Sequence, residues 1–148
     1  MDRRSVKSRV LPVAAALAFL VLSGCSSLPR TEIDCSHFPG AAQRDEFTPP
    51  DESDTVDTKL AEKMMTRKAY PKYPELAMRA GLQGMVWVKL WIGQDGIVKR
   101  ASVVKSDAEI FNEVSLEAAL KLVFSPASCG GTPISVWATI PIRFKLID

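Results

Sequence analysis

The stretch MVWVKLWI, residues 85–92, decides the fold, because its β-branched and aromatic residues predict a long β-strand. The residues GQDG at 93–96 are typical of a turn, and residues 97–104 return as the second strand of a hairpin. A third strand is predicted over 134–146. Together these segments predict a three-stranded antiparallel sheet.

Two helices are predicted beside this sheet. Pro74 suits the first position of a short helix over 75–80, and Gly81 ends that helix because glycine adopts positive φ without a steric penalty. Apolar residues at 111, 114, 118 and 122 predict a second helix over 111–124. The order helix, strand, strand, helix, strand indicates an α+β fold with both helices on one face of the sheet.

Alternation along the strands places the tryptophans on one face. The aliphatic residues of 86–92 point toward the helices, so Trp87, Trp91 and Trp137 fall on the opposite side. Monomers seldom leave such an apolar patch exposed. Two interpretations stay open. Either the turn 60–65 or a second copy of the domain covers the patch, or the patch is a surface for a partner or a polymer.

The N-terminus has the pattern of an export signal. Basic residues within positions 1–9 precede an uncharged run over 10–22, which is shorter than the roughly 20 apolar residues that span a bilayer. The run ends in Leu22-Ser23-Gly24-Cys25, which resembles the bacterial lipobox. We therefore predict a lipoprotein signal peptide over 1–24 and a lipid, with chains such as palmitate, on Cys25. Serine at position 26 favours the periplasmic face of the outer membrane.

Residues 25–66 are interpreted as a linker between the lipid and a domain over 67–148. Residues 25–58 hold four prolines and eight acidic residues against two basic ones, which is typical of an extended, largely disordered chain. Residues 58–65 can add two helical turns. Residues 59–148 hold 13 basic and eight acidic residues without a basic run, so nucleic acid is not an expected partner.

The cysteines favour a disulfide rather than a metal site. With lipid on Cys25, Cys35 and Cys129 remain as an even pair in an oxidising compartment. Cys35 and His37 alone are too few ligands for a metal ion. His37 is the only histidine, and the sequence contains no nucleophile–base set and no phosphate-binding loop. We therefore expect no metal, no cofactor and no enzymatic activity.

From about residue 70 to residue 146 the chain resembles the C-terminal domain of the TonB family. The resemblance rests on many weak matches in one order, and these agree with the predicted strands and helices. The matching residues are Tyr73-Pro74, Ala77, Gly81, Gly84, Val86, Val88, Asp95-Gly96, Val98, Val103, Ser106, Phe111, Leu116, Ala118, Phe124, Pro126-Ala127, Gly131, Pro133, Ile140-Pro141-Ile142 and Phe144.

The resemblance implies a periplasmic domain that binds peptides. In the family the last strand lies at the sheet edge, and an extended segment of an outer-membrane transporter pairs beside it. Here that edge is 134–145, where Pro141 is tolerated only at an edge or a bulge. The residues expected on the edge strand are Ile134, Val136, Ala138, Ile140 and Ile142, and those expected beside the peptide are Tyr70, Tyr73 and Pro74.

Two functions are compatible with these observations. The first is a lipid-anchored adaptor that binds an extended segment of an outer-membrane transporter or another envelope protein by strand addition. The second is a non-catalytic assembly module that forms a homodimer or contacts peptidoglycan through the tryptophan face. A role for Tyr70 and Tyr73 in packing against the end of the sheet also stays open.

Overall fold

The computed structural model describes residues 31–38, 40–45 and 47–146. The predicted signal peptide and Cys25 lie outside these residues. Within the described part of the chain, no helix is both long enough and apolar enough to cross a membrane.

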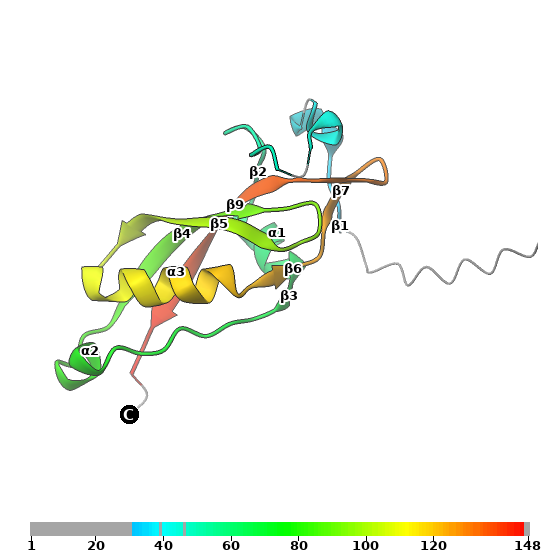
Figure 1. Cartoon of the computed structure of the whole chain (residues 1–148). Helices are drawn as coiled ribbons and strands as arrows, with labels where there is room; N and C mark the ends of the chain where they lie inside the picture. Colours follow the sequence, from blue (N-terminus) through cyan, green and yellow to red (C-terminus); the bar gives the residue numbers. More distant parts are fainter. Residues whose placement is uncertain (1–30, 39, 46, 147–148) are drawn as a thin grey trace, which may run out of the picture.

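Three long strands form the centre of the fold (Figure 1). β4 (Gly84–Ile92) pairs antiparallel with both β5 (Val98–Ser106) and β9 (Val136–Phe144), so it is the central strand. The predicted α+β fold with a three-stranded antiparallel sheet is therefore confirmed. A fourth strand that the sequence did not reveal, β2 (Thr55–Val56), pairs parallel with the outer side of β9.

The helices share one core with this sheet. α3 (Asn112–Leu120) follows the short 3-10 helix η3 (Glu109–Phe111) and packs against β5 and β4 (Figure 1). α2 (Glu75–Arg79) and α1 (Thr58–Met64) bury small or flexible side chains in the same core. The buried helix residues include Ala61, Met64, Ala77, Ala118 and Ala119.

The predicted helix over 111–124 is wrong at its C-terminal end. The helix ends at Leu120, and β6 (Val123–Phe124) pairs antiparallel with β3 (Met65–Arg67). The Phe124 N–H donates to the Gly96 carbonyl at 2.9 Å, which holds this segment against the hairpin turn. Gly96 has a φ of +79°, and a side chain there would collide with the Phe124 carbonyl, so this crossing requires glycine.

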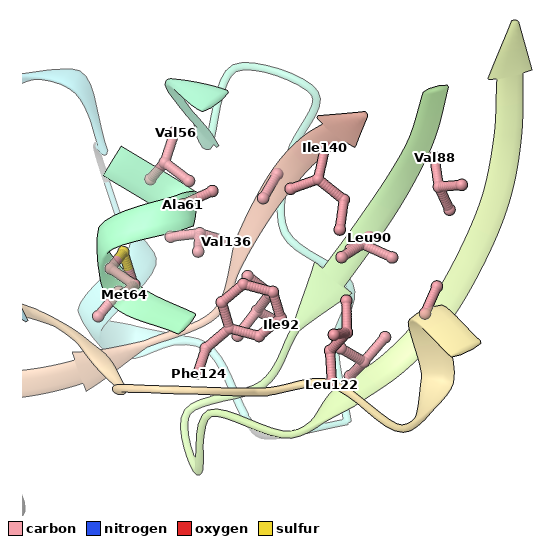
Figure 2. Close-up of a cluster of buried hydrophobic side chains, with 14 of the residues drawn as sticks. Val56, Ala61, Met64, Val88, Leu90, Ile92, Leu122, Phe124, Val136 and Ile140 are labelled. Carbon is pink, nitrogen blue, oxygen red and sulfur yellow. The ribbon is translucent and has the colours of Figure 1, made fainter. Parts of the chain in front are cut away.

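The core lies between the sheet and the helices (Figure 2). Alternate residues of β4 point into it, and Phe111 stacks on Phe144 with ring centroids 4.2 Å apart. Burial of such side chains is the main favourable term in folding. The buried strand residues include Val86, Val88, Leu90, Ile92, Phe124, Val136, Ala138, Ile140 and Phe144.

A second, small sheet lies beside the start of β9. β7 (Ala127–Cys129) pairs with β8 (Thr132–Ile134) in a hairpin, and β1 (Thr31–Glu32) adds parallel to β7. Ile134 therefore belongs to this sheet, where it is fully buried, and its prediction as part of the peptide-binding edge is wrong. Gly130 and Gly131 both adopt positive φ and turn β7 into β8, so Ile134 pairs with Ala127, and the break at Ser135 separates it from β9.

The segment predicted as an extended, largely disordered linker is folded in its described part. The predicted disulfide between Cys35 and Cys129 is present, with the Cα atoms 5.4 Å apart. Beyond it the chain forms two short 3-10 helices, η1 (Cys35–His37) and η2 (Ala41–Gln43), and then β2. The low apolar content did not prevent order, because one covalent bond, several polar contacts and the buried side chains of Phe38, Ala41 and Val56 hold this segment on the domain.

Candidate functional site

The outer edge of β9 is divided into a covered half and an open half. β2 covers the first half in a parallel register that places Thr55 opposite Trp137. The Trp137 N–H donates to the Asp54 carbonyl at 2.7 Å, and Thr58 Oγ1 donates to the Thr139 carbonyl at 2.9 Å. Beyond Thr139, no strand within the described residues pairs with this side of β9.

The residues that face this edge differ by one position from the predicted set. Hydrogen-bonding direction alternates along a strand, so Pro141 and Arg143 share the outward direction of Trp137 and Thr139. Four of the residues predicted on the edge strand lie on β9, but their backbone groups do not face its open side. Pro141 was the available signal, because a residue without an N–H is best tolerated where it faces away from the neighbouring strand. The predicted residues whose backbone groups turn toward β4 instead are Val136, Ala138, Ile140 and Ile142.

A groove with a volume of about 390 Å³ runs beside the open half of β9. One wall is formed by residues 140–143 of β9, and the other by residues 68–71. Glu62, Met65 and Leu122 complete the lining, so the groove is mainly apolar with a few charged groups. A strand that paired with the open edge would lie in this groove.

The structure separates the two tyrosines that were predicted to flank a peptide. Tyr70 lines the groove and is 84% exposed, so its ring is accessible to a ligand. The Tyr73 hydroxyl donates to the Leu82 carbonyl, and its ring packs edge-on against the Phe111–Phe144 stack at centroid distances of 5.8 and 5.7 Å. Tyr73 therefore has the packing role that the sequence left open. Pro74 is the N-cap residue of α2.

The predicted tryptophan patch is partly covered, since Trp91 is buried and Trp87 and Trp137 are half-buried. Trp91 is only 9% exposed, and Trp137 lies directly opposite it with the ring centroids 6.4 Å apart. Trp137 Nε1 donates to the carbonyl of the buried Pro50 at 2.9 Å. Residues 50–52 therefore cover this part of the face. The turn 60–65, which was expected there, lies in the core instead, because Ala61 and Met64 are its buried residues.

Charged groups hold residues 44–54 on the sheet. The Arg44 guanidinium forms an ion pair with Asp54, whose side chain is fully buried. Lys89 Nζ lies 4.6 Å from the centre of the Trp137 ring and 2.6 Å from the Glu52 carboxylate. The face of an indole ring attracts a cation at this distance. Polar and ionic contacts, rather than apolar burial, therefore hold residues 44–54 on the sheet.

Sequence reasoning missed β2 and its anchors. Two residues are too few for an alternation signal, and Asp54 looks like any other acidic residue of this tail. The available signal was Val56, an isolated aliphatic residue in a polar stretch. Across the described parts of the chain, no group of three or more His, Cys, Asp or Glu side chains is arranged to hold a metal ion.

Comparisons with known proteins point to one family. Residues 69–146 match the family described as Gram-negative bacterial TonB protein C-terminal. Protein TonB of Vibrio cholerae is 32% identical over 84 residues, which cover 56% of this chain and 34% of that protein. Protein tonB2 of Pseudomonas aeruginosa is 34% identical over 77 residues, which cover 51% of this chain and 28% of that protein. The match therefore spans about a third or less of these relatives.

A solved structure, the solution NMR structure of the Pseudomonas aeruginosa TonB CTD, is similar over 57% of this chain and 86% of that chain. Its sequence identity is 28% and its TM-score is 0.48. The family match includes most of the groove and the whole open half of β9, and it confirms the resemblance seen in the sequence. Because this match covers more than half of the residues, the chain belongs to the TonB C-terminal domain family.

Proposed function

We propose that this chain is a non-catalytic adaptor of the cell envelope that binds an extended peptide beside β9, in TonB-dependent transport or its regulation. The peptide comes from an outer-membrane transporter or another envelope protein. The observation that carries this proposal is the open half of the β9 edge, which lies directly beside the groove.

The chemistry of the edge and the groove supports strand addition. Unpaired backbone groups at a sheet edge bind the backbone of an extended peptide, and pockets beside the edge select its side chains. Apolar groove residues such as Met65 and Ile142 suit aliphatic side chains, and Tyr70 adds an exposed ring. Lys68 and Arg143 bring positive charge to the same groove, which favours a peptide that carries an acidic residue.

The proposed anchor is a lipid on Cys25, on the periplasmic face of the outer membrane. The pairing of β1 with β7 and the disulfide hold the chain on the domain from Thr31 onward, so the free tether from Cys25 to Thr31 reaches at most about 20 Å. A domain on such a short tether stays close to its own membrane, where outer-membrane proteins are accessible. Intact mass of the protein purified from membranes tests this anchor, because it reports both the cleavage site and the acyl chains.

The binding test is a titration of the isotopically labelled full chain in detergent micelles with N-terminal peptides of outer-membrane transporters. We expect the amide signals of residues 139–144 and of the groove segment 68–71 to shift together. If neither segment responds to millimolar peptide, the proposal is wrong.

Two variants of Arg143 separate backbone from side-chain binding. Arg143→Pro removes an outward N–H of the open edge, and an edge strand tolerates proline there. Arg143→Ala removes the charge but keeps the N–H. We expect the proline variant to bind at least about fivefold more weakly than the alanine variant, since one hydrogen bond contributes about 1 kcal/mol. Equal affinities would indicate that only side chains bind the peptide.

The assembly module is not supported by a specific observation. It needs an accessible tryptophan face, whereas Trp91 is buried and residues 50–52 cover Trp137. We therefore do not propose a homodimer or a peptidoglycan contact through that face.

A further inference from the structure

The open half of the β9 edge offers few groups to a new strand. Outward positions in this half are Pro141 and Arg143, which follow from the direction of the Trp137 and Thr139 hydrogen bonds. Pro141 has no N–H, so Arg143 supplies the one outward donor between residues 140 and 143. A peptide confined to this half gains little from backbone pairing.

The covered half of the β9 edge has the outward backbone N–H groups that the open half largely lacks. The Trp137 N–H points outward and is taken by the Asp54 carbonyl. The parallel register of β2 also directs the Thr139 N–H and the Trp137 carbonyl toward β2. A ligand strand that used these groups would have to replace β2. The two strands compete for the same atoms.

β2 is built like a replaceable ligand rather than like a core strand. It is two residues long, and Val56 is its buried side chain, at 5% exposure. Figure 2 shows Val56 at the margin of the core, beside Ala61. The contacts on its N-terminal side are polar: the Arg44–Asp54 ion pair and the hydrogen bond from Trp137 Nε1 to Pro50. On its C-terminal side the chain enters α1, which is buried in the core through Ala61 and Met64 and can stay in place while β2 leaves the edge. Segments with little apolar burial open more easily than a core strand does.

We propose that residues 54–56 are a built-in occupant of the β9 edge, and that an extended peptide running parallel to β9 binds by replacing them. This inference rests on the proposed function and adds its regulation and its ligand geometry. The incoming peptide places an aliphatic side chain where Val56 lies and supplies carbonyl groups to the Trp137 and Thr139 amides. The occupied edge also protects the free protein from unwanted strand pairing.

The test uses a probe taken from the chain itself. A fluorescent synthetic peptide with the sequence of residues 50–58, PDESDTVDT, is titrated into the full chain and followed by anisotropy. The variant Val56→Pro weakens the internal strand, because proline removes the N–H that faces the Trp137 carbonyl. The matched control Thr55→Val changes an exposed neighbour and keeps every backbone donor.

We expect Val56→Pro to bind the probe about tenfold more tightly than the unchanged chain and Thr55→Val to bind it as the unchanged chain does. A tenfold gain corresponds to an edge that is free one-tenth of the time before the substitution. Equal affinity of Val56→Pro and the unchanged chain, with both shown to be folded by circular dichroism, would overturn the proposal.

A second measurement on the unchanged chain covers the case in which Val56→Pro does not fold. Saturating transporter peptide should raise the hydrogen-exchange rates of the amides at 54–56, because these residues leave the edge. If the peptide shifts residues 139–144 but leaves 54–56 as protected as before, the occupant is not displaced, and the inference fails while the proposed function stands. If no transporter peptide binds, the proposed function fails. The inference is then decided with saturating PDESDTVDT peptide: faster hydrogen exchange at the amides of 54–56 supports it, and unchanged exchange overturns it.

Discussion

The central sheet and the covering segment, residues 31–57, are stabilised by different interactions. In the sheet, alternate residues of β4 are buried among aromatic and aliphatic side chains. In the covering segment, a disulfide, an ion pair and single hydrogen bonds to the Pro50 and Asp54 carbonyls act beside a few buried apolar side chains, including those of Phe38, Ala41 and Val56. The sheet therefore depends on many shared contacts, whereas the segment depends on a few contacts that can be removed one at a time.

The largest effect is expected in the core. Phe111 is fully buried and stacks on Phe144, so Phe111→Ala should lower the free energy of unfolding by about 3–5 kcal/mol. Urea denaturation followed by circular dichroism measures this loss. Leu120→Ala is the matched control, because Leu120 is 50% exposed and its loss should stay within about 0.5 kcal/mol. Similar losses for both variants would mean that the core is not the main source of stability.

A smaller effect is expected when the covering segment is released. The double variant Cys35→Ser with Cys129→Ser removes a bond that closes a separation of 94 residues, and such bonds contribute typically about 2–4 kcal/mol. Hydrogen exchange should show that residues 31–38 lose protection first while β4 amides remain the slowest to exchange. If β4 exchanges as fast as residues 31–38, the two regions unfold together and the comparison is wrong.

The contacts over the tryptophan face can be separated by a pair of variants. Trp137→Phe removes the hydrogen bond from Nε1 to Pro50, which contributes about 1 kcal/mol. Trp91→Phe is the control, because the buried Nε1 of Trp91 has no hydrogen-bond partner in the described structure. Hydrogen exchange at the amides of 51–54 should accelerate in the first variant alone. Equal acceleration would assign the attachment to ring packing.

The smallest effect is a pH dependence at the hairpin turn. Burial alone would raise the pKa of Asp95, but hydrogen bonds from Lys99 and from the Ile97 N–H lower it below its ordinary value. A lowered pKa in the folded state means that the ionised carboxylate stabilises the fold above about pH 4 and that this contribution disappears as the pH falls through the folded pKa.

Asp95→Asn should therefore destabilise the protein at pH 7 by less than about 1 kcal/mol, since the side chain is partly exposed. Thermal unfolding between pH 7 and pH 3 measures the effect, and the difference between the variant and the unchanged chain should shrink in acid. A difference that stays constant across this range would exclude the carboxylate as its cause.

The same contrast explains what the sequence could predict. The β-branched and aromatic residues of 85–92 and the turn residues at 93–96 are local signals, so the hairpin was predicted within a residue or two. The end of α3 was missed because the Phe124–Gly96 hydrogen bond joins distant segments. The covering segment was missed for the same reason. The ion pair between Arg44 and Asp54 has no local sequence signal, and among these long-range contacts only the disulfide was predicted, from the paired cysteines.

For the site, the last strand and Tyr70 were predicted from the family resemblance, and the structure places both beside the groove. The prediction did not specify which backbone groups of this strand face outward. That direction depends on how β9 pairs with β4 and β2, which a single strand does not encode. Tyr73 also matches the family pattern, yet its ring packs against the core, so a matching residue was not evidence of a ligand contact.

The disulfide also determines how mechanical load would pass through the molecule. A pull on the chain before Cys35 enters the small sheet directly through Cys129, because the covalent bond bypasses everything between them. The residues of β2 lie inside that bypass and carry no tension. Reduction of the bond would redirect the same pull along residues 36–54 and peel β2 away from β9, so the redox state decides whether tension reaches β2.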